Sequence, residues 1–261
     1  MSPLDDIRPS PIAGTWYPRD ITRLSRQLDD MLAGVQPRPV TGRVMGLIVP
    51  HAGYQYSGLT AAHGFAMVRG MQPDLVVIFS PFHDYHPAQI ISSGHVSYLT
   101  PLGQVGVNLD VLARFETRLL AEEGYKIERV LNDREHSLEI ELPFLQRALA
   151  GEFQLLPLMI RSRNLAITET IGRLLAPLLD PERTLLIAST DLSHFYPEKV
   201  AHRLDQEMLK RMAGFSPRDV LAAEEEGVGY ACGAGAVAAM LSTARHLGAN
   251  AVEILHYSTS G

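Results

Sequence analysis

The stretch that decides the fold is 44–54, which reads Val-Met-Gly-Leu-Ile-Val-Pro-His-Ala-Gly-Tyr. An apolar run of this length, ended by proline and followed by polar and small residues, is typical of a buried strand that leads into a functional loop. Apolar runs followed by polar residues also occur at 75–84, Leu-Val-Val-Ile-Phe-Ser-Pro-Phe-His-Asp, and, without a proline, at 185–194, Leu-Leu-Ile-Ala-Ser-Thr-Asp-Leu-Ser-His. Because helix-period stretches separate these runs, the sequence predicts strand-crossover-strand units around a parallel sheet.

The rest of the chain continues this alternation of short strands and longer helices. Strands are expected at Val44–Val49, Leu75–Phe79, Leu155–Ile160, Leu185–Ala188 and Val252–Leu255. Helices, with apolar residues spaced by three and four, are expected at Arg19–Leu32, Leu59–Val68, Leu109–Glu122, Leu138–Leu149, Ile167–Leu178, Lys199–Met212 and Ala234–Leu247. Pro143 should kink its helix or mark the first turn. We predict one α/β domain over residues 1–261, with a central, mostly parallel sheet flanked by helices.

Composition narrows the classes of partner. The chain has 23 Lys and Arg against 29 Asp and Glu, a formal net charge of -6, which argues against nucleic acid as the main partner. Its start is acidic where a secretory signal would be basic, and no apolar run approaches the roughly 20 residues that span a bilayer. The single cysteine cannot form an internal disulfide. We therefore expect a cytoplasmic protein with a reduced thiol and no membrane partner.

Three histidines and an aspartate follow the predicted strands. His51, His83, Asp191 and His194 each come after an apolar run. In open parallel sheets, ligands bind beyond the carboxyl ends of the strands, because the strand-to-helix loops gather there. Each histidine alone is equally well explained as a buried imidazole bonded to the backbone, and only their convergence favours a site. His86, in the same loop as His83, is a reserve candidate.

Cys232 lies in a small-residue loop, Gly-Val-Gly-Tyr-Ala-Cys-Gly-Ala-Gly at 227–235, that leads into a predicted helix. One interpretation is a small buried hydrophobe. The other is a thiolate ligand, because a helix N-terminus lowers the pKa of a thiol. The residues alone leave both open.

The segment 133–145 concentrates charge before an amphipathic helix. For Glu135, Glu139 and Glu141 we prefer a solvated helix start, in which acids complement the helix dipole. His136 is expected to point into the crevice as a base or a substrate contact. Since the chain contains no His-Glu-x-x-His, phosphate loop or Gly-x-Ser-x-Gly motif, zincin, NTPase and α/β-hydrolase functions are disfavoured.

Six stretches, in order along the chain, resemble the Memo family, also called AmmeMemoRadiSam system protein B. They are Ala13–Pro18 (Ala-Gly-Thr-Trp-Tyr-Pro), Pro50–Gly58 (Pro-His-Ala-Gly-Tyr-Gln-Tyr-Ser-Gly), Glu135–Glu139 (Glu-His-Ser-Leu-Glu), Leu142–Leu145 (Leu-Pro-Phe-Leu), Asp191–His194 (Asp-Leu-Ser-His) and Ala231–Gly233 (Ala-Cys-Gly). The resemblance implies a fold similar to class III extradiol ring-cleaving dioxygenases, which hold iron(II) with two histidines and a carboxylate.

The resemblance also implies roles for individual residues. His51 and His83 match the two histidine ligands, and Cys232 matches the third ligand of Memo proteins. His194 matches the dioxygenase acid or base, while Asp191 and His136 would line the pocket. The family usually has Gly-Pro before its second histidine, whereas this chain has Ser-Pro at 80–81, which keeps His86 as an alternative to His83.

A thiolate in place of the dioxygenase carboxylate favours copper(I), zinc or a different iron chemistry, so ring cleavage does not follow from the resemblance. Two functions remain open. One is a metal-dependent oxidoreductase with iron or copper, acting alone or beside radical SAM and Ammecr-type partner proteins on an unidentified small molecule or peptide. The other is a non-enzymatic carrier of reduced copper or a peptide- or protein-binding module.

Overall fold

The computed structural model describes residues 6–259, and its centre is a six-stranded sheet in the order β2-β9-β3-β8-β4-β7. Four of its strands run parallel: β2 (Gly46–Val49), β9 (Thr184–Ser189), β3 (Leu75–Ser80) and β8 (Gln154–Ile160). Every residue of β3 and β9 is buried, which explains why these strands read as continuous apolar runs. The predicted fold class, a mostly parallel α/β sheet flanked by helices, is confirmed.

The far edge of this sheet and a second, smaller sheet were not predicted. β4 (Ile90–Ser93) pairs antiparallel with β8 and parallel with β7 (Ile127–Val130). The smaller sheet has the order β1-β5-β6, from strands Ile7–Arg8, Ser97–Thr100 and Gly103–Gly106. These strands are short and rich in polar residues and glycine, so they carry no apolar periodicity that a sequence pattern can detect.

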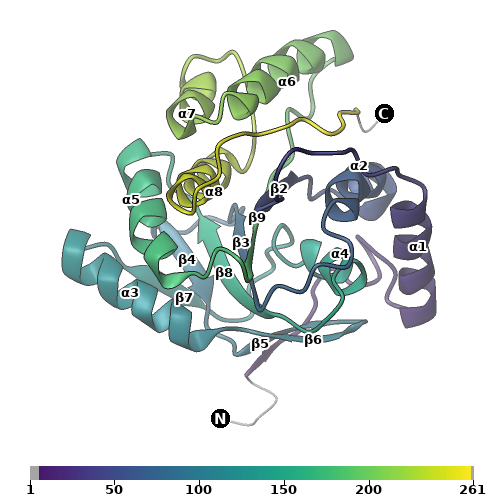
Figure 1. Ribbon diagram of the computed structural model, residues 1–261, viewed down its shortest axis with the longest axis horizontal. Helices are drawn as coiled ribbons and strands as arrows, with labels where there is room; N and C mark the ends of the chain where they lie inside the picture. Colours follow the sequence, from purple (N-terminus) through teal and green to yellow (C-terminus); the bar gives the residue numbers. More distant parts are fainter. Residues whose placement is uncertain (1–5, 260–261) are drawn as a thin grey trace.

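Helices cover both faces of the larger sheet (Figure 1). On one side lie α3 (Leu109–Glu123), α5 (Leu165–Leu175) and α8 (Ala234–His246), with the short 3-10 helix Ala176–Leu178 after α5. On the other side lie α1 (Ile21–Ala33), α2 (Tyr54–Ala66) and α4 (Glu141–Ala148). The helices α6 (Glu198–Ala213) and α7 (Pro217–Glu225) pack next to one another beyond α8. Within residues 6–259, no helix is long and apolar enough to cross a membrane.

Local sequence signals account for several helix ends. Asp20 begins α1 by accepting the backbone N–H of Arg23, and Asn108 begins α3 by accepting that of Val111. Pro143 lies in the first turn of α4, as predicted, where its missing N–H costs no helical hydrogen bond.

The segment Val252–Leu255 is not a strand, which corrects the prediction. Arg38 donates to the carbonyl of Ile254 at 3.3 Å, and the Tyr257 hydroxyl donates to Asp205 of α6 at 2.7 Å. The segment therefore takes its polar contacts from side chains, and its short apolar run packs against the core without joining the sheet.

Candidate metal centre

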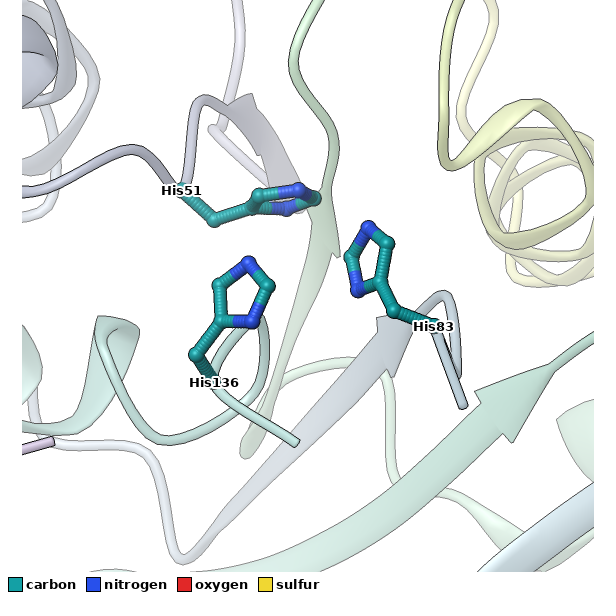
Figure 2. Close-up of side chains that lie close together, drawn as sticks. All are labelled: His51, His83 and His136. Carbon is teal, nitrogen blue, oxygen red and sulfur yellow. The ribbon is translucent and has the colours of Figure 1, made fainter. Parts of the chain in front are cut away.

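Three neighbouring strands deliver side chains to one point. β2, β9 and β3 are adjacent and parallel, so the loops after them meet at the same edge of the sheet. His51 follows β2 and His83 follows β3, and His136 reaches the same point from the loop before α4 (Figure 2). One ligand atom from each of these three rings lies within 4.8 Å of the others. The three imidazoles form a group that can hold a metal ion.

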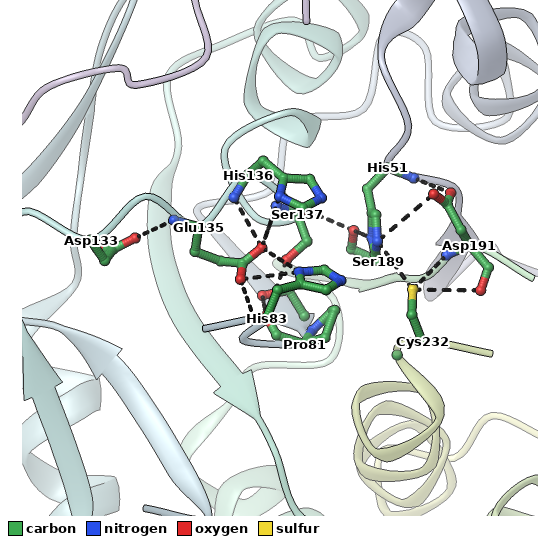
Figure 3. A network of polar contacts seen from close by, with 12 residues as sticks. His51, Pro81, His83, Asp133, Glu135, His136, Ser137, Ser189, Asp191 and Cys232 are labelled. Atoms are coloured by element: carbon green, nitrogen blue, oxygen red, sulfur yellow. Dashed lines mark hydrogen bonds and ion pairs between the residues drawn. The ribbon is translucent and has the colours of Figure 1, made fainter. Parts of the chain in front are cut away.

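Cys232 joins this group from the N-terminal end of α8. Its Sγ lies 3.1 Å from Nε2 of His51 (Figure 3), and His83 also stabilises the thiolate form. The backbone N–H of Asp191 donates to the same sulfur at 3.3 Å. This approach requires glycine at 233, because a Cβ there would lie 2.5 Å from the carbonyl oxygen of Ser189. The predicted ligands His51, His83 and Cys232 are thus brought together.

A buried carboxylate orients His83. Glu135 accepts the backbone N–H of His83 at 2.6 Å and contacts its Nδ1 at 2.9 Å. It also accepts the backbone N–H groups of His136 and Ser137 at 2.9 and 2.8 Å. Burial opposes ionisation, but these donors outweigh it and hold the pKa of Glu135 well below its usual range. With Nδ1 of His83 bonded to Glu135, Nε2 is the nitrogen left for a metal.

A second chain of contacts orients His51. Its Nδ1 lies 2.9 Å from the Ser189 hydroxyl, which lies 2.7 Å from Oε1 of Glu141. The backbone N–H of His51 donates to Asp191 at 2.8 Å. These contacts leave Nε2 of His51 facing the sulfur of Cys232.

The prediction that Glu135, Glu139 and Glu141 are solvated is wrong. Their side chains are buried, as is that of Arg8, which donates to Glu139 at 2.6 Å, to the carbonyl of Glu135 at 2.6 Å and to Asp133 at 2.8 Å. A charge-rich segment before a helix is usually solvated. Here Arg8, which is more than a hundred residues away in the chain, supplies the buried partner of Glu139, whereas Glu135 is held by His83 and backbone N–H groups and Glu141 contacts Ser189.

The pKa of the Cys232 thiol is lowered. Burial disfavours the thiolate, but the charge and hydrogen bond of His51 and the hydrogen bond of His83 outweigh it and lower the pKa of Cys232 to about 6. Burial alone would lower the pKa of His83, but its bonds to Cys232 and Glu135 raise it to about 10. A metal ion bound here would displace the histidine protons that balance the thiolate.

His136 has the opposite electrostatic character. Burial and the neighbouring His51 and His83 lower its pKa to about 4, against the opposing effect of Glu135. Its ring stacks on Trp16 with centroids 4.1 Å apart and on His83 at 4.6 Å. His136, predicted as a base or substrate contact, is a neutral imidazole inside the histidine group and can act as a donor to a metal or an acceptor of a proton.

The chain is similar to known proteins over nearly its whole length. Residues 8–261 match the family of Memo-like proteins. The chain belongs to this family. Curated relatives named MEMO1 family protein include those of Methanosarcina mazei, 31% identical over 98% of this chain and 93% of the relative, and of Aquifex aeolicus, 29% identical over 98% and 92%. That of Nitrosopumilus maritimus is 28% identical over 98% and 93%.

A solved structure of an uncharacterized protein from Escherichia coli K12 aligns with 77% of this Memo-like chain and 89% of its own, at a TM-score of 0.45 and 16% identity.

An open cleft of about 870 Å³ lies beside the histidine group of this Memo-like protein. Trp16, Asp191, His194 and Tyr257 contribute to its wall. His194 is exposed and donates its Nδ1–H to the carbonyl of Leu192 at 2.9 Å. Of the predicted catalytic residues, Asp191 therefore faces both the thiol and the cleft, whereas His194 lies at the cleft and outside the histidine group.

His86 does not belong to the histidine group, because its Nδ1 accepts the backbone N–H of Ala88 at 3.2 Å. His83 is the histidine of this loop that lies in the group. The glutamates that orient the rings were missed at the sequence level. The available signal was their position close to His136, since Glu135 precedes it directly and Glu141 begins α4, and carboxyl groups near a ligand histidine are frequent orienting partners.

The donor atoms fit a transition metal. Imidazole nitrogen suits zinc, copper and iron, and thiolate sulfur adds a preference for copper(I) or zinc. Hard oxygen-preferring ions such as Mg²⁺ and Ca²⁺ do not fit a set of nitrogen and sulfur donors.

Proposed function

We propose that this Memo-like protein binds a redox-active metal ion, iron or copper, through His51, His83 and Cys232. The observation that carries the proposal is that two imidazoles, each oriented through Nδ1 by a hydrogen-bond partner, face a thiol whose pKa is about 6. Orientation of both rings before binding reduces the cost of assembling the site.

We further propose that the protein is a metal-dependent oxidoreductase. Three protein ligands leave a coordination position open, as in catalytic sites, and a bound iron or copper ion would supply redox chemistry there. His136, with a pKa of about 4, would accept a proton from a bound substrate only transiently, and its stacking on Trp16 holds the ring in place. His194 lines the cleft, where it can exchange protons with solvent.

The main alternative is a carrier of reduced copper. The thiolate of Cys232 and the two histidines form a soft donor set, which favours copper(I). A carrier needs no proton transfer, so the substitution His194→Ala separates the two functions. An enzyme would lose turnover while it retains its metal, and a carrier would transfer copper as well as the wild type does. A peptide-binding module, with or without the Ammecr-type or radical SAM partners, would show neither property.

The first experiment is the metal content of protein purified anaerobically from its own host. We expect stoichiometric iron or copper in the wild type and its loss in Cys232→Ser and His51→Ala. The matched control is His86→Ala, which removes a nearby histidine outside the group and should keep its metal. The single tryptophan, Trp16, stacks on His136, so its fluorescence should change on reconstitution. No metal in any sample and no uptake on reconstitution would overturn the proposal.

A further inference from the structure

The Ser189 hydroxyl is the meeting point of three buried groups behind the metal centre. Its oxygen lies 2.6 Å from the carbonyl oxygen of Ser137, 2.7 Å from Oε1 of Glu141 and 2.9 Å from Nδ1 of His51. Ser189, Glu141 and His51 have 0%, 1% and 2% of their surface exposed, so solvent does not satisfy these contacts. The three contacts must therefore be satisfied by hydrogens of the groups themselves.

Counting hydrogens leaves one arrangement. A hydroxyl donates one hydrogen bond and accepts two. A backbone carbonyl only accepts, so the hydroxyl hydrogen of Ser189 must go to Ser137. The two remaining neighbours must then each donate to the Ser189 oxygen. Oε1 of Glu141 therefore carries a hydrogen, and so does Nδ1 of His51.

We infer that Glu141 is a positioning residue, a buried neutral acid that holds the Ser189 hydroxyl so that His51 keeps its hydrogen on Nδ1 and presents Nε2 to the ion. The part that concerns the ion rests on the proposed function, whereas the hydrogen positions do not. Glu141 acts through Ser189, so its effect is on the orientation and tautomer of the ligand and not on the reacting atoms.

The surroundings of Glu141 support a neutral acid. Among the described residues, no ion pair involves Glu141, whereas the neighbouring Glu139 is paired with Arg8 at 2.6 Å. Burial raises the pKa of Glu141 well above its usual range. A carboxylate without a cation is costly in such a place, and a neutral acid is not.

The test compares two replacements of Glu141 of similar size. Glu141→Gln keeps a donor, because its amide N–H₂ can donate to Ser189 as the acid does, so we expect copper(I) affinity within about twofold of wild type. Glu141→Leu removes the donor and should weaken copper(I) binding about tenfold. Thermal unfolding of both variants checks that each is folded. Equal weakening in both variants would show that an ionised carboxylate is required and would overturn the inference.

A second measurement reads the tautomer without any metal. Long-range ¹H–¹⁵N correlation spectra of the metal-free protein with labelled histidine, recorded at a pH high enough that His51 has lost the second hydrogen that balances the thiolate, report which ring nitrogen keeps its hydrogen, and loss of signals in His51→Ala assigns the ring. We expect a hydrogen on Nδ1 of His51 in the wild type and in Glu141→Gln, and a mixture of tautomers in Ser189→Ala, where Nδ1 has no acceptor. A bare Nδ1 in the wild type would overturn the inference even if the protein binds copper, and a protein that binds no metal could still confirm it.

Discussion

Two of the histidines in the group are oriented by carboxyl groups that differ in charge. An ionised carboxylate, Glu135, contacts His83, and a neutral acid, Glu141, acts on His51 through Ser189. Glu135 accepts three backbone N–H groups and contacts Nδ1 of His83, which stabilises an ionised carboxylate. Glu141 meets a single hydroxyl, that of Ser189, and stays neutral. The two glutamates lie six residues apart in one segment. The number of donors that the fold directs at a buried carboxyl therefore decides its charge, and its position in the sequence does not.

His83 and His51 also differ in their exposure to solvent. The side chain of His83 is 39% exposed and that of His51 is 2% exposed. A charged partner suits His83, because its own backbone N–H and those of His136 and Ser137 stabilise the buried carboxylate of Glu135. A neutral chain suits the buried ring, because an extra charge behind it would be desolvated. In both His83 and His51, Nε2 is still the nitrogen on the side of Cys232.

The largest effect on stability should come from replacement of Arg8, which contacts the segment that contains Glu135 and has no contact with Glu141. Arg8→Ala leaves Glu139 and Asp133 as buried carboxylates without their partner. We expect a loss of about 3–5 kcal/mol in the free energy of unfolding, measured by chemical denaturation. The control is Arg183→Ala, which breaks the exposed pair with Asp74 and should leave stability nearly unchanged. Equal losses in the two variants would mean that burial adds nothing to the Arg8 network.

The sharpest comparison is Glu135→Gln against Glu141→Gln. An amide at 135 would direct a donor at N–H groups that already donate, so we expect metal affinity to fall about 10- to 100-fold. At 141 the same change should have little effect. Competition with a chelator of known affinity measures both. If the two variants lose affinity equally, the carboxyls are in the same charge state and the comparison fails.

The thiolate of Cys232 is stabilised by both His51 and His83, so its titration reports on both rings. We expect the thiolate absorbance of metal-free protein to appear with a midpoint near pH 6, as the pKa of Cys232 is lowered from 9.0 to about 6. A lowered pKa means that the thiolate persists down to this pH and is lost as the pH falls through it. Because Cys232 is the single cysteine, the signal is unambiguous.

Replacement of either histidine should raise this midpoint, since each stabilises the thiolate. His51→Ala should raise it more than His83→Ala, because His51 contributes both charge and a hydrogen bond. A midpoint that stays near 6 in both variants would contradict the roles assigned to the two rings.

The smallest effect is expected for His194→Ala. His194 is exposed and bonds to the carbonyl of Leu192, outside the histidine group. Metal content, measured by mass spectrometry, should stay at the wild-type level, and any turnover should fall. Loss of the metal in this variant would place His194 in the centre and would require the ligand set to be revised.

Much of the site could be predicted from single residues. His51 and His83 follow apolar strands, and strand ends of a parallel sheet share one edge, so their convergence follows from chain order and the fold class. For Cys232 the sequence is compatible with both a buried hydrophobe and a ligand, and only the tertiary structure places its Sγ 3.1 Å from Nε2 of His51. The sequence predicts a strand at Val252–Leu255, which is wrong, because three apolar residues in a run of four do not reveal whether a sheet edge is available.

By itself, the sequence determined the alternation of strands and helices and the edge at which the polar residues gather, because both depend on local apolar runs. Only the tertiary structure decided that His136 joins the group, that Glu135 is ionised and that Glu141 is neutral. The charge of Glu135 depends on His83, which follows β3, and that of Glu141 depends on Ser189 at the end of β9, and these residues meet only in the folded chain. A charge state is set by the donors around a group and by its burial, and neither is written in the residues next to it.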